Sequence, residues 1–209
     1  GPLGRPVLRD VDGRPYVPGS ALRGALRHGL EALLRGLDEP AKGLWATDPE
    51  DPAHSQTPTA RLFGTAEAPG LVRLGDAWLL DRQGPAPIEL REALRLDPAT
   101  GSAAADGAQV FEVVPPGASF ALELFADNLD DWELGLLLCG FDQLAEGFLT
   151  LGGLTARGLG RVALRWTAAV DFEPRELLYT GGRIPDAAAR DPEGRMAAWR
   201  AALAAKLEG

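Results

Sequence analysis

Two segments near opposite ends of the chain, both rich in glycine and arginine, most constrain what this sequence can fold into. The first covers residues 15–27 and the second covers residues 151–162. Each joins a glycine-rich turn to arginines, and such a turn can bring backbone N–H groups and a guanidinium close to a phosphate. Two such elements in one small domain predict that a polyanion is held between them.

The first segment predicts a long amphipathic helix. Ser20 is expected to be its N-cap, because the preceding Pro-Gly pair forces a turn. Gly24 and Gly29 are expected to let another element approach the helix closely. Leucines recur at helical spacing along one stripe: Leu22, Leu26, Leu30, Leu33 and Leu37.

Glycine backbone and arginine side chains supply the predicted phosphate contacts of both segments. Arginine suits planar, bidentate contacts with phosphate, and the start of a helix adds positive partial charge. Aromatic residues are not interleaved with these arginines, so we expect binding along a nucleic-acid backbone rather than base stacking. The predicted contact residues are Gly19, Ser20, Arg23, Arg27, Gly152, Gly153, Arg157, Gly158, Gly160 and Arg161.

The overall charge argues against the binding of a polyanion. The 209 residues carry a net charge of −9, which by itself argues against a nucleic-acid partner. The distribution of charge matters more, because acidic residues concentrate in 38–50 and 127–133, away from the two arginine-bearing segments. An acidic adaptor that binds other proteins therefore stays open as an alternative. The single cysteine, Cys139, lies in an apolar run and is expected to be a buried, inert thiol.

Between the two segments the sequence alternates short elements with turns. Residues 38–60 predict a long loop, 71–80 a strand, and 82–109 an irregular insertion or hairpin. Residues 110–114 and 119–125 predict a strand pair, and 161–170 a last strand. Residues 132–146 predict a helix capped by Asp131 that packs centrally on a sheet. A C-terminal helix is predicted from the stripe Met196, Trp199, Leu203 and Leu207.

Four blocks of this sequence, in this order, resemble the RAMP superfamily of CRISPR-associated proteins. The resemblance runs from about residue 5 to residue 170 and is strongest to the backbone subunits of type III effector complexes. The blocks are Pro6–Asp10 with Gly13–Ser20 and Leu22-Arg23-Gly24; Leu62-Phe63-Gly64 with Gly70 and Asp76-Ala77; Arg91 with Leu96-Asp97, Thr100–Ala103 and Phe111-Glu112; and Gly152-Gly153 with Arg157–Val162.

The resemblance implies an α+β fold with a modified ferredoxin-like, RRM-type core. It implies one RAMP-type domain over residues 1–209, with the loop 38–60, a thumb-like insertion at 82–109 and a C-terminal helical extension at 171–209. The strand that precedes the first helix in such a fold is not evident in the sequence. The thumb would wedge into a guide–target duplex, and its candidate residues are Arg91, Leu94, Leu96 and Asp97.

The resemblance also implies partners. These are CRISPR RNA, complementary target RNA, other CRISPR effector subunits and further copies of this chain. The first helix and the glycine-rich loop would hold phosphates of the guide. In this arrangement base pairing supplies the specificity, and the protein need only follow the RNA backbone.

Several members of this superfamily cut target RNA with an aspartate and a divalent metal. In those members the aspartate lies two residues before the Pro-Val of the first block, and that position is Gly4 here. Asp10 is a weak alternative candidate, which the turn Asp10-Val11-Asp12-Gly13 explains without chemistry. We therefore expect a scaffold with no cofactor, and Mg²⁺ or Mn²⁺ only if the chain is catalytic. A metal-dependent endoribonuclease stays open as the alternative.

His28 and His54 lack the spacing of metal ligands or of a base beside a nucleophile, so we assign neither a catalytic role. No apolar stretch approaches the roughly 20 residues of a membrane span, and no signal peptide is visible. A cytoplasmic location without membrane contact is therefore expected.

Overall fold

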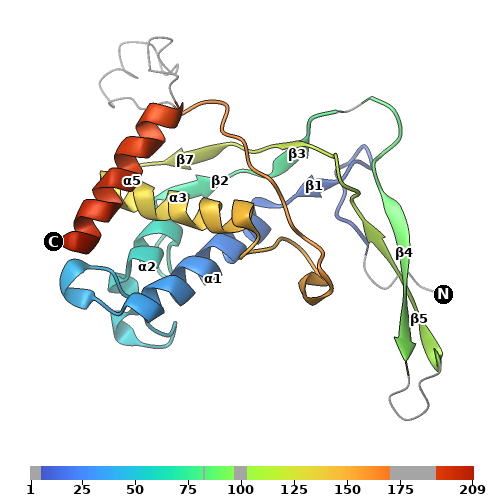
Figure 1. Ribbon diagram of the computed structural model, residues 1–209, viewed down its shortest axis with the longest axis horizontal. Helices are drawn as coiled ribbons and strands as arrows, with labels where there is room; N and C mark the ends of the chain where they lie inside the picture. The colour runs from blue at the N-terminus through green and yellow to red at the C-terminus, as the bar shows by residue number, and fades with distance from the viewer. Residues whose placement is uncertain (1–5, 82, 97–102, 170–191) are drawn as a thin grey trace. The chain divides into compact units, whose positions relative to one another are not determined.

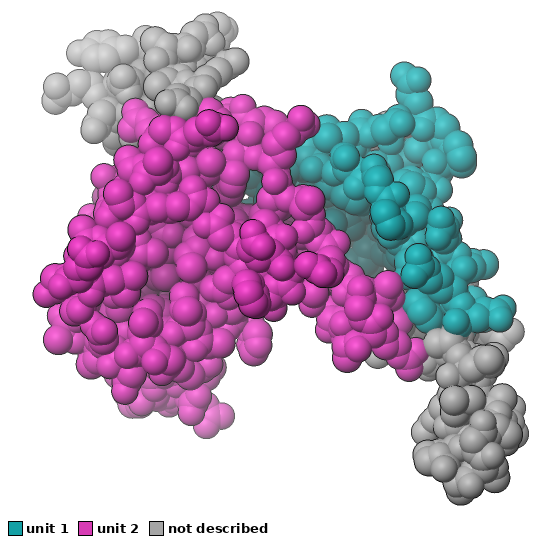
Figure 2. Space-filling model, in the orientation of Figure 1, with its two compact units in different colours: residues 1–20, 74–124 teal, residues 21–73, 125–209 magenta. Residues whose placement is uncertain are grey.

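The computed structural model describes residues 6–81, 83–96, 103–169 and 192–209 (Figure 1). The chain forms two compact units (Figure 2). Unit 1 comprises Gly1–Ser20 and Leu74–Leu124, and unit 2 comprises Ala21–Arg73 and Phe125–Gly209. The predicted mixed α+β class is confirmed, and the elements are consistent with the RRM-like RAMP fold.

Unit 1 contains a small antiparallel sheet with the strand order β1-β3-β6. Its strands are β1 (Tyr16–Val17), β3 (Ala77–Leu79) and β6 (Phe120–Ala121). Strand β1 lies directly before the first helix, so the strand that was not evident in the sequence is present there. In β3 the side chains alternate, with Ala77 and Leu79 buried and Trp78 exposed between them. One face of this sheet is therefore packed and the other is open to solvent.

The predicted strand at 71–80 is divided into two. Strand β2 (Val72–Leu74) pairs with β7 (Leu124–Ala126), whereas β3 belongs to the sheet with β1. Gly75 and Asp76 separate the two strands, and the Gly75 N–H donates to the Glu123 carbonyl at 3.0 Å. A glycine and an aspartate within an apolar run thus end one strand before the next begins.

A long hairpin forms within the predicted insertion. Strand β4 (Glu89–Leu96) pairs antiparallel with β5 (Ala103–Val113), from Glu89 opposite Val113 to Leu96 opposite Ala103. The predicted pairing of 110–114 with 119–125 is therefore wrong, because Val110–Val113 pairs with β4. The register of β4 and β5 shifts between Leu94 and Leu96, as at a β-bulge.

Unit 2 is mainly helical (Figure 1). Its helices are α1 (Gly19–Leu37, which begins in unit 1), α2 (Pro58–Phe63), α3 (Asp131–Glu146) and α5 (Pro192–Glu208). The predicted C-terminal helix is confirmed as α5, while 171–191 of the expected extension lies outside the described residues. The described part of this unit also contains 3-10 turns at Pro40–Lys42, Pro52–Gln56 and Thr155–Arg157.

The buried stripe of α1 differs from the predicted one in its last members. Leu34 is fully buried, whereas Leu33 and Leu37 are each more than a third exposed. Gly29 allows a close approach, because a Cβ there would lie 2.5 Å from Leu149 Cδ1, but Gly24 has open space around it. The i, i+4 series that continues to Leu34 therefore forms the face that packs.

Helix α3 packs between two other helices. A Cβ on Gly140 would lie 3.3 Å from Leu26 of α1, and one on Gly135 would lie 2.3 Å from the Trp199 carbonyl of α5. These glycines let the helix axes come close, so α3 makes close contacts with both α1 and α5. At the outer side, Arg200 forms two hydrogen bonds with Asp142, the shorter at 2.7 Å.

The N-terminus of α3 is fixed by a buried carboxylate. Glu133 accepts from the Asp130 N–H at 2.9 Å, so Asp130, not the predicted Asp131, is the capping residue. The other oxygen of Glu133 pairs with Arg61 Nε of α2 at 2.6 Å, and the Glu133 side chain is only 2% exposed. Arg61 also donates to the Asn128 carbonyl at 3.0 Å. The pair ties α2 to the start of α3.

Two further elements differ from expectation. The segment predicted as a long loop, 38–60, contains two 3-10 turns and the start of α2, and it buries Leu44, Thr57 and Thr59. The last predicted strand, 161–170, has no strand pairing over residues 161–169, and residue 170 lies outside the described part. Its alternating apolar residues pack individually, as Trp166 does edge-on against Phe141.

Candidate nucleic-acid interface

The arginines of α1 are hydrogen-bonded within unit 2. Arg23 Nη2 donates to the Phe63 carbonyl, and Arg27 Nη1 donates to the Gly64 carbonyl at 2.8 Å. These carbonyls lie at the C-terminal end of α2, where helix carbonyls lack partners within the helix. A Cβ on Gly64 would lie 2.5 Å from the Gly70 nitrogen, so this turn is tightly folded. The first two blocks of the resemblance thus meet at this contact.

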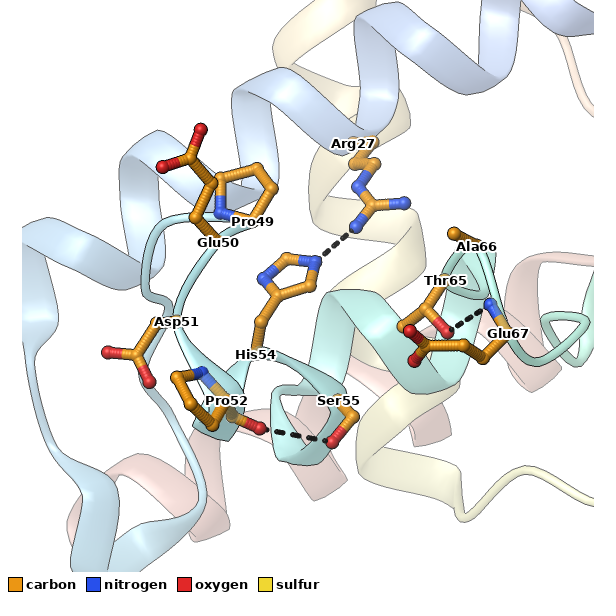
Figure 3. Close-up of a pocket in the computed structure, with 10 residues that line it drawn as sticks. All are labelled: Arg27, Pro49, Glu50, Asp51, Pro52, His54, Ser55, Thr65, Ala66 and Glu67. Atoms are coloured by element: carbon orange, nitrogen blue, oxygen red, sulfur yellow. Dashed lines mark hydrogen bonds between the residues drawn. The ribbon is translucent and has the colours of Figure 1, made fainter.

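Arg27 is also the centre of a partly buried cluster (Figure 3). Its Nε donates to Glu31 Oε1 at 2.8 Å, and its Nη2 lies 2.7 Å from Nε2 of His54. His54 is only 6% exposed. Because arginine can only donate, Nε2 of His54 must accept, and the imidazole proton is then on Nδ1. That Nδ1 is buried and has no hydrogen-bond partner among the described residues.

A cavity of about 520 Å³ adjoins this cluster (Figure 3). Arg27 and His54 lie on one side, and the carboxylates of Glu50, Asp51 and Glu67 line it as well. The Ala53 N–H and the Thr47 hydroxyl lower the pKa of Asp51, which favours its charged form. Because three acidic residues and one arginine line it, the cavity has a negative balance of charge, which opposes the entry of phosphate.

The start of α1 is held by a carboxylate. The Gly19 N–H donates to Asp76 Oδ1 at 2.8 Å, and a Cβ on Gly19 would lie 2.3 Å from the Leu74 carbonyl. The helix begins at Gly19, one residue before the predicted N-cap Ser20. Asp76 therefore takes the place at the helix start where an anion would bind.

The second predicted segment folds into the glycine-rich loop, defined here as residues 151–160. The Leu151 N–H donates to the Gly160 carbonyl at 2.9 Å, which closes its base. Gly152, Gly158 and Gly160 all have positive φ, and Gly152 and Gly158 have no atoms within 4 Å of an added Cβ. Gly153 is exposed as well. The space around Gly152 and Gly158 therefore leaves room for a phosphate to approach the backbone, although the Gly158 N–H donates to the Thr155 carbonyl at 3.0 Å.

The two arginines of this segment differ. The Arg157 side chain is exposed, and its guanidinium has no hydrogen bond or ion pair to the described residues, while the Arg157 N–H donates to the Leu154 carbonyl at 2.8 Å. Arg161 packs against Gly147 and donates to the Glu146 carbonyl at 3.3 Å. Arg157 is thus available to an external anion, whereas Arg161 supports the end of α3.

The α1 arginines and the loop lie on different sides of α1. Leu149, just before the loop, packs against Gly29. Arg27 precedes Gly29 by two positions, which corresponds to about 200° around a helix. The described contacts therefore do not join the two predicted phosphate-binding groups into one cleft.

The thumb candidates lie on the β4–β5 hairpin of unit 1. Arg91 pairs with Phe111 across the hairpin, and its guanidinium is 4.0 Å from Glu89. Leu94 lies opposite Ala108 and Leu96 opposite Ala103, while Asp97 lies outside the described residues. Glu112 accepts from the Val7 N–H at 2.9 Å and from Arg9 at 2.6 Å. The base of the hairpin is therefore tied to the N-terminal segment.

The catalytic question centres on Gly4 and Asp10. Gly4 lies outside the described residues. Asp10 Oδ1 accepts from the N–H groups of Asp12 and Arg14 at 3.0 and 2.9 Å, so its carboxylate organises the turn. Within the described ranges, no group of three or more His, Cys, Asp or Glu side chains could hold a metal ion.

The comparison with protein families identifies the chain. The model of the RAMP superfamily matches residues 3–163, so the chain belongs to this superfamily of CRISPR-associated, RNA-binding proteins. Proteins of this superfamily bind CRISPR RNA and other CRISPR subunits. A search of curated proteins found no match. Among the described residues, no helix has the length and apolar character needed to cross a membrane.

Proposed function

We propose that this chain is a backbone subunit of a type III CRISPR effector complex, and that its glycine-rich loop holds phosphates of the guide RNA. The observation that carries this proposal is the combination of Arg157 with the open backbone of Gly152 and Gly158. A guanidinium without an acceptor among the described residues, the Gly152 N–H and the open space around both glycines can together bind a phosphate without reading its base, while the Gly158 N–H itself donates to the Thr155 carbonyl at 3.0 Å. A scaffold for guides of variable sequence requires this kind of binding.

In this proposal the β4–β5 hairpin acts as the thumb that spaces the guide–target duplex. Antiparallel pairing extends to Leu96 opposite Ala103, which gives the hairpin the length to reach a neighbouring duplex. The tie between Glu112 and Arg9 fixes its base. Target RNA, other effector subunits and further copies of this chain are the proposed partners.

The loop is tested by Arg157→Ala. We expect RNA affinity to fall by about 1 kcal/mol for every sequence tested, and the salt dependence to decrease by about one phosphate contact. Arg200→Ala is the matched control, since it removes one positive charge from an exposed pair with Asp142. Equal losses in both variants, or none in Arg157→Ala, would refute the proposed loop contact.

The hairpin is tested by shortening it in register. Ala93 lies opposite Gln109, so residues 94–108 can be replaced by Asn-Gly, a two-residue hairpin turn. We expect the assembled complex to keep its guide but to lose the regular distortion of the guide–target duplex, measured by chemical probing of the RNA. If chemical probing gave the same pattern for the duplex in both complexes, the proposed thumb role of the hairpin would be refuted.

A further inference from the structure

An aromatic pair lies on the open face of the unit 1 sheet. Tyr16 of β1 and Trp78 of β3 are direct cross-strand partners. Their rings stack, with centroids 5.2 Å apart and planes at 22°. Trp78 remains 44% exposed, whereas its neighbours Ala77 and Leu79 are buried on the opposite face.

The sheet uses only one face of the indole ring. Strand β3 is central, with Tyr16 on its β1 side and Ala121 opposite Trp78 on its β6 side. Ala121 is exposed and offers only a methyl group. Stacking on Tyr16 therefore fixes the indole, while its second face has no large neighbour from the adjoining strand. A fixed, half-free aromatic face is the arrangement on which a nucleobase stacks.

A cationic group accompanies the pair. Arg14 lies two positions before Tyr16, next to the bridge between Pro15 and Arg9, so strand alternation places it on the side of Tyr16. The Arg14 side chain is half-buried, and its Nη1, which is itself shielded from solvent, has no hydrogen-bond partner in the described part of the chain. A positive charge two positions from the stacked tyrosine fits a nucleotide with its phosphate better than an apolar protein surface.

We infer that Trp78, supported by Tyr16, stacks a base of single-stranded RNA, and that Arg14 contacts the adjoining phosphate. This inference rests on the proposed function in that it adds a second RNA contact, in unit 1, to the loop in unit 2. Every base has a π-face, so stacking here would not select a sequence.

The test compares two RNA ligands, a single-stranded oligouridylate of about 12 nucleotides and the same strand with abasic positions. We expect Trp78→Leu, which keeps an apolar side chain but loses the flat ring, to weaken oligouridylate binding by about 5- to 100-fold. The same change should leave the abasic strand unaffected, and Trp78→Phe should retain most of the affinity. Arg14→Gln should weaken the binding of both ligands. Phe125→Ala, at a side chain that is 47% exposed, is the control and should change neither.

Each other outcome overturns the inference. Equal losses of Trp78→Leu with both RNAs would assign Trp78 to folding alone. Unchanged RNA binding with altered self-association would assign this face to a protein contact. If Trp78→Leu binds normally while Arg157→Ala is weakened, stacking fails and the proposed function stands. If the unaltered chain binds neither RNA, the proposed function fails as well.

Discussion

Helix α1 and the glycine-rich loop both place arginines beside glycines, yet their guanidinium groups have different partners. Arg23 and Arg27 donate to carbonyls at the end of α2, and Arg27 also holds Glu31 and His54. Arg157 in the loop has no partner among the described residues. The same residue types thus serve internal structure in one region and face solvent in the other.

This comparison separates two measurable effects. An arginine that satisfies buried groups should affect the free energy of unfolding, because its removal leaves those groups unpaired. An exposed arginine without partners should affect RNA binding and leave stability unchanged.

Arg27→Ala should lower the free energy of unfolding by about 3 kcal/mol, because Glu31 and the Gly64 carbonyl lose a donor within a partly buried cluster. Urea denaturation measures this loss. Arg35→Ala is the matched control, since Arg35 approaches the same Glu31 only at 3.6 Å from a more exposed position. Its expected cost is under about 1 kcal/mol. If both variants lost the same free energy of unfolding, the distinction between the two regions would not hold.

Within the loop, Gly160→Ala should cost about 2 kcal/mol of stability. Its φ is +87°, and the new Cβ would lie 2.2 Å from the Leu151 carbonyl oxygen. Gly158→Ala, at φ +81° with open space, should cost only about 1 kcal/mol from backbone strain. Thermal unfolding of the two variants gives the comparison, and a larger loss for Gly158→Ala would contradict the described loop.

Asp76→Ala should destabilise α1 by about 1 kcal/mol, because the Gly19 N–H loses its acceptor. Asp76→Asn keeps an acceptor and removes the charge, so it separates the hydrogen bond from electrostatics. If RNA phosphate approaches this helix start, both variants should bind RNA more tightly than the unaltered chain. If both variants bound RNA with unchanged affinity, the RNA would not approach the start of α1, and the glycine-rich loop would differ from α1 in RNA contact as well.

The smallest effect concerns pH. The Val7 N–H, followed by the Arg9 guanidinium, lowers the pKa of Glu112 below its ordinary 4.5. A lowered carboxyl pKa stabilises the fold above the unfolded-state pKa, and this stabilisation is lost as pH falls through the folded-state value. Glu112→Gln should therefore lose less stability than the unaltered chain on acidification below about pH 4.5. Denaturation curves of both proteins from pH 6 to pH 3 measure this difference. If the free energy of unfolding depended on pH in the same way in both, the prediction would be contradicted.

The sequence predicted the helices better than the strands. Periodic leucines specify a helix locally, so α1, α3 and α5 were expected close to their observed positions. A strand needs a partner strand, and its apolar residues do not specify which segment that partner is. Val110–Val113 was therefore paired with the wrong neighbour, and the alternation in 161–169 was taken for a strand that is not formed.

The candidate site was predictable in composition but not in its contacts. The glycine-rich loop was recognisable because its residues are contiguous. The partners of Arg23 and Arg27 lie about 40 residues away, and the burial of His54 arises only when the 38–60 segment folds. The stack of Tyr16 on Trp78 joins two strands that are still more remote in sequence. Local sequence patterns carry no signal for contacts between residues that lie so far apart in the chain.

The pair of half-exposed Arg61 and buried Glu133 has a consequence for how this chain can change through descent. Loss of Arg61 would leave the Glu133 carboxylate buried without its ion pair while it still holds the Asp130 N–H, whereas loss of Glu133 would leave Arg61 partly in solvent. A lineage that first replaces Arg61 should therefore be short-lived unless a change at position 133 follows. Among relatives of this chain, an acidic residue at position 133 is expected to be inherited together with a basic residue at position 61.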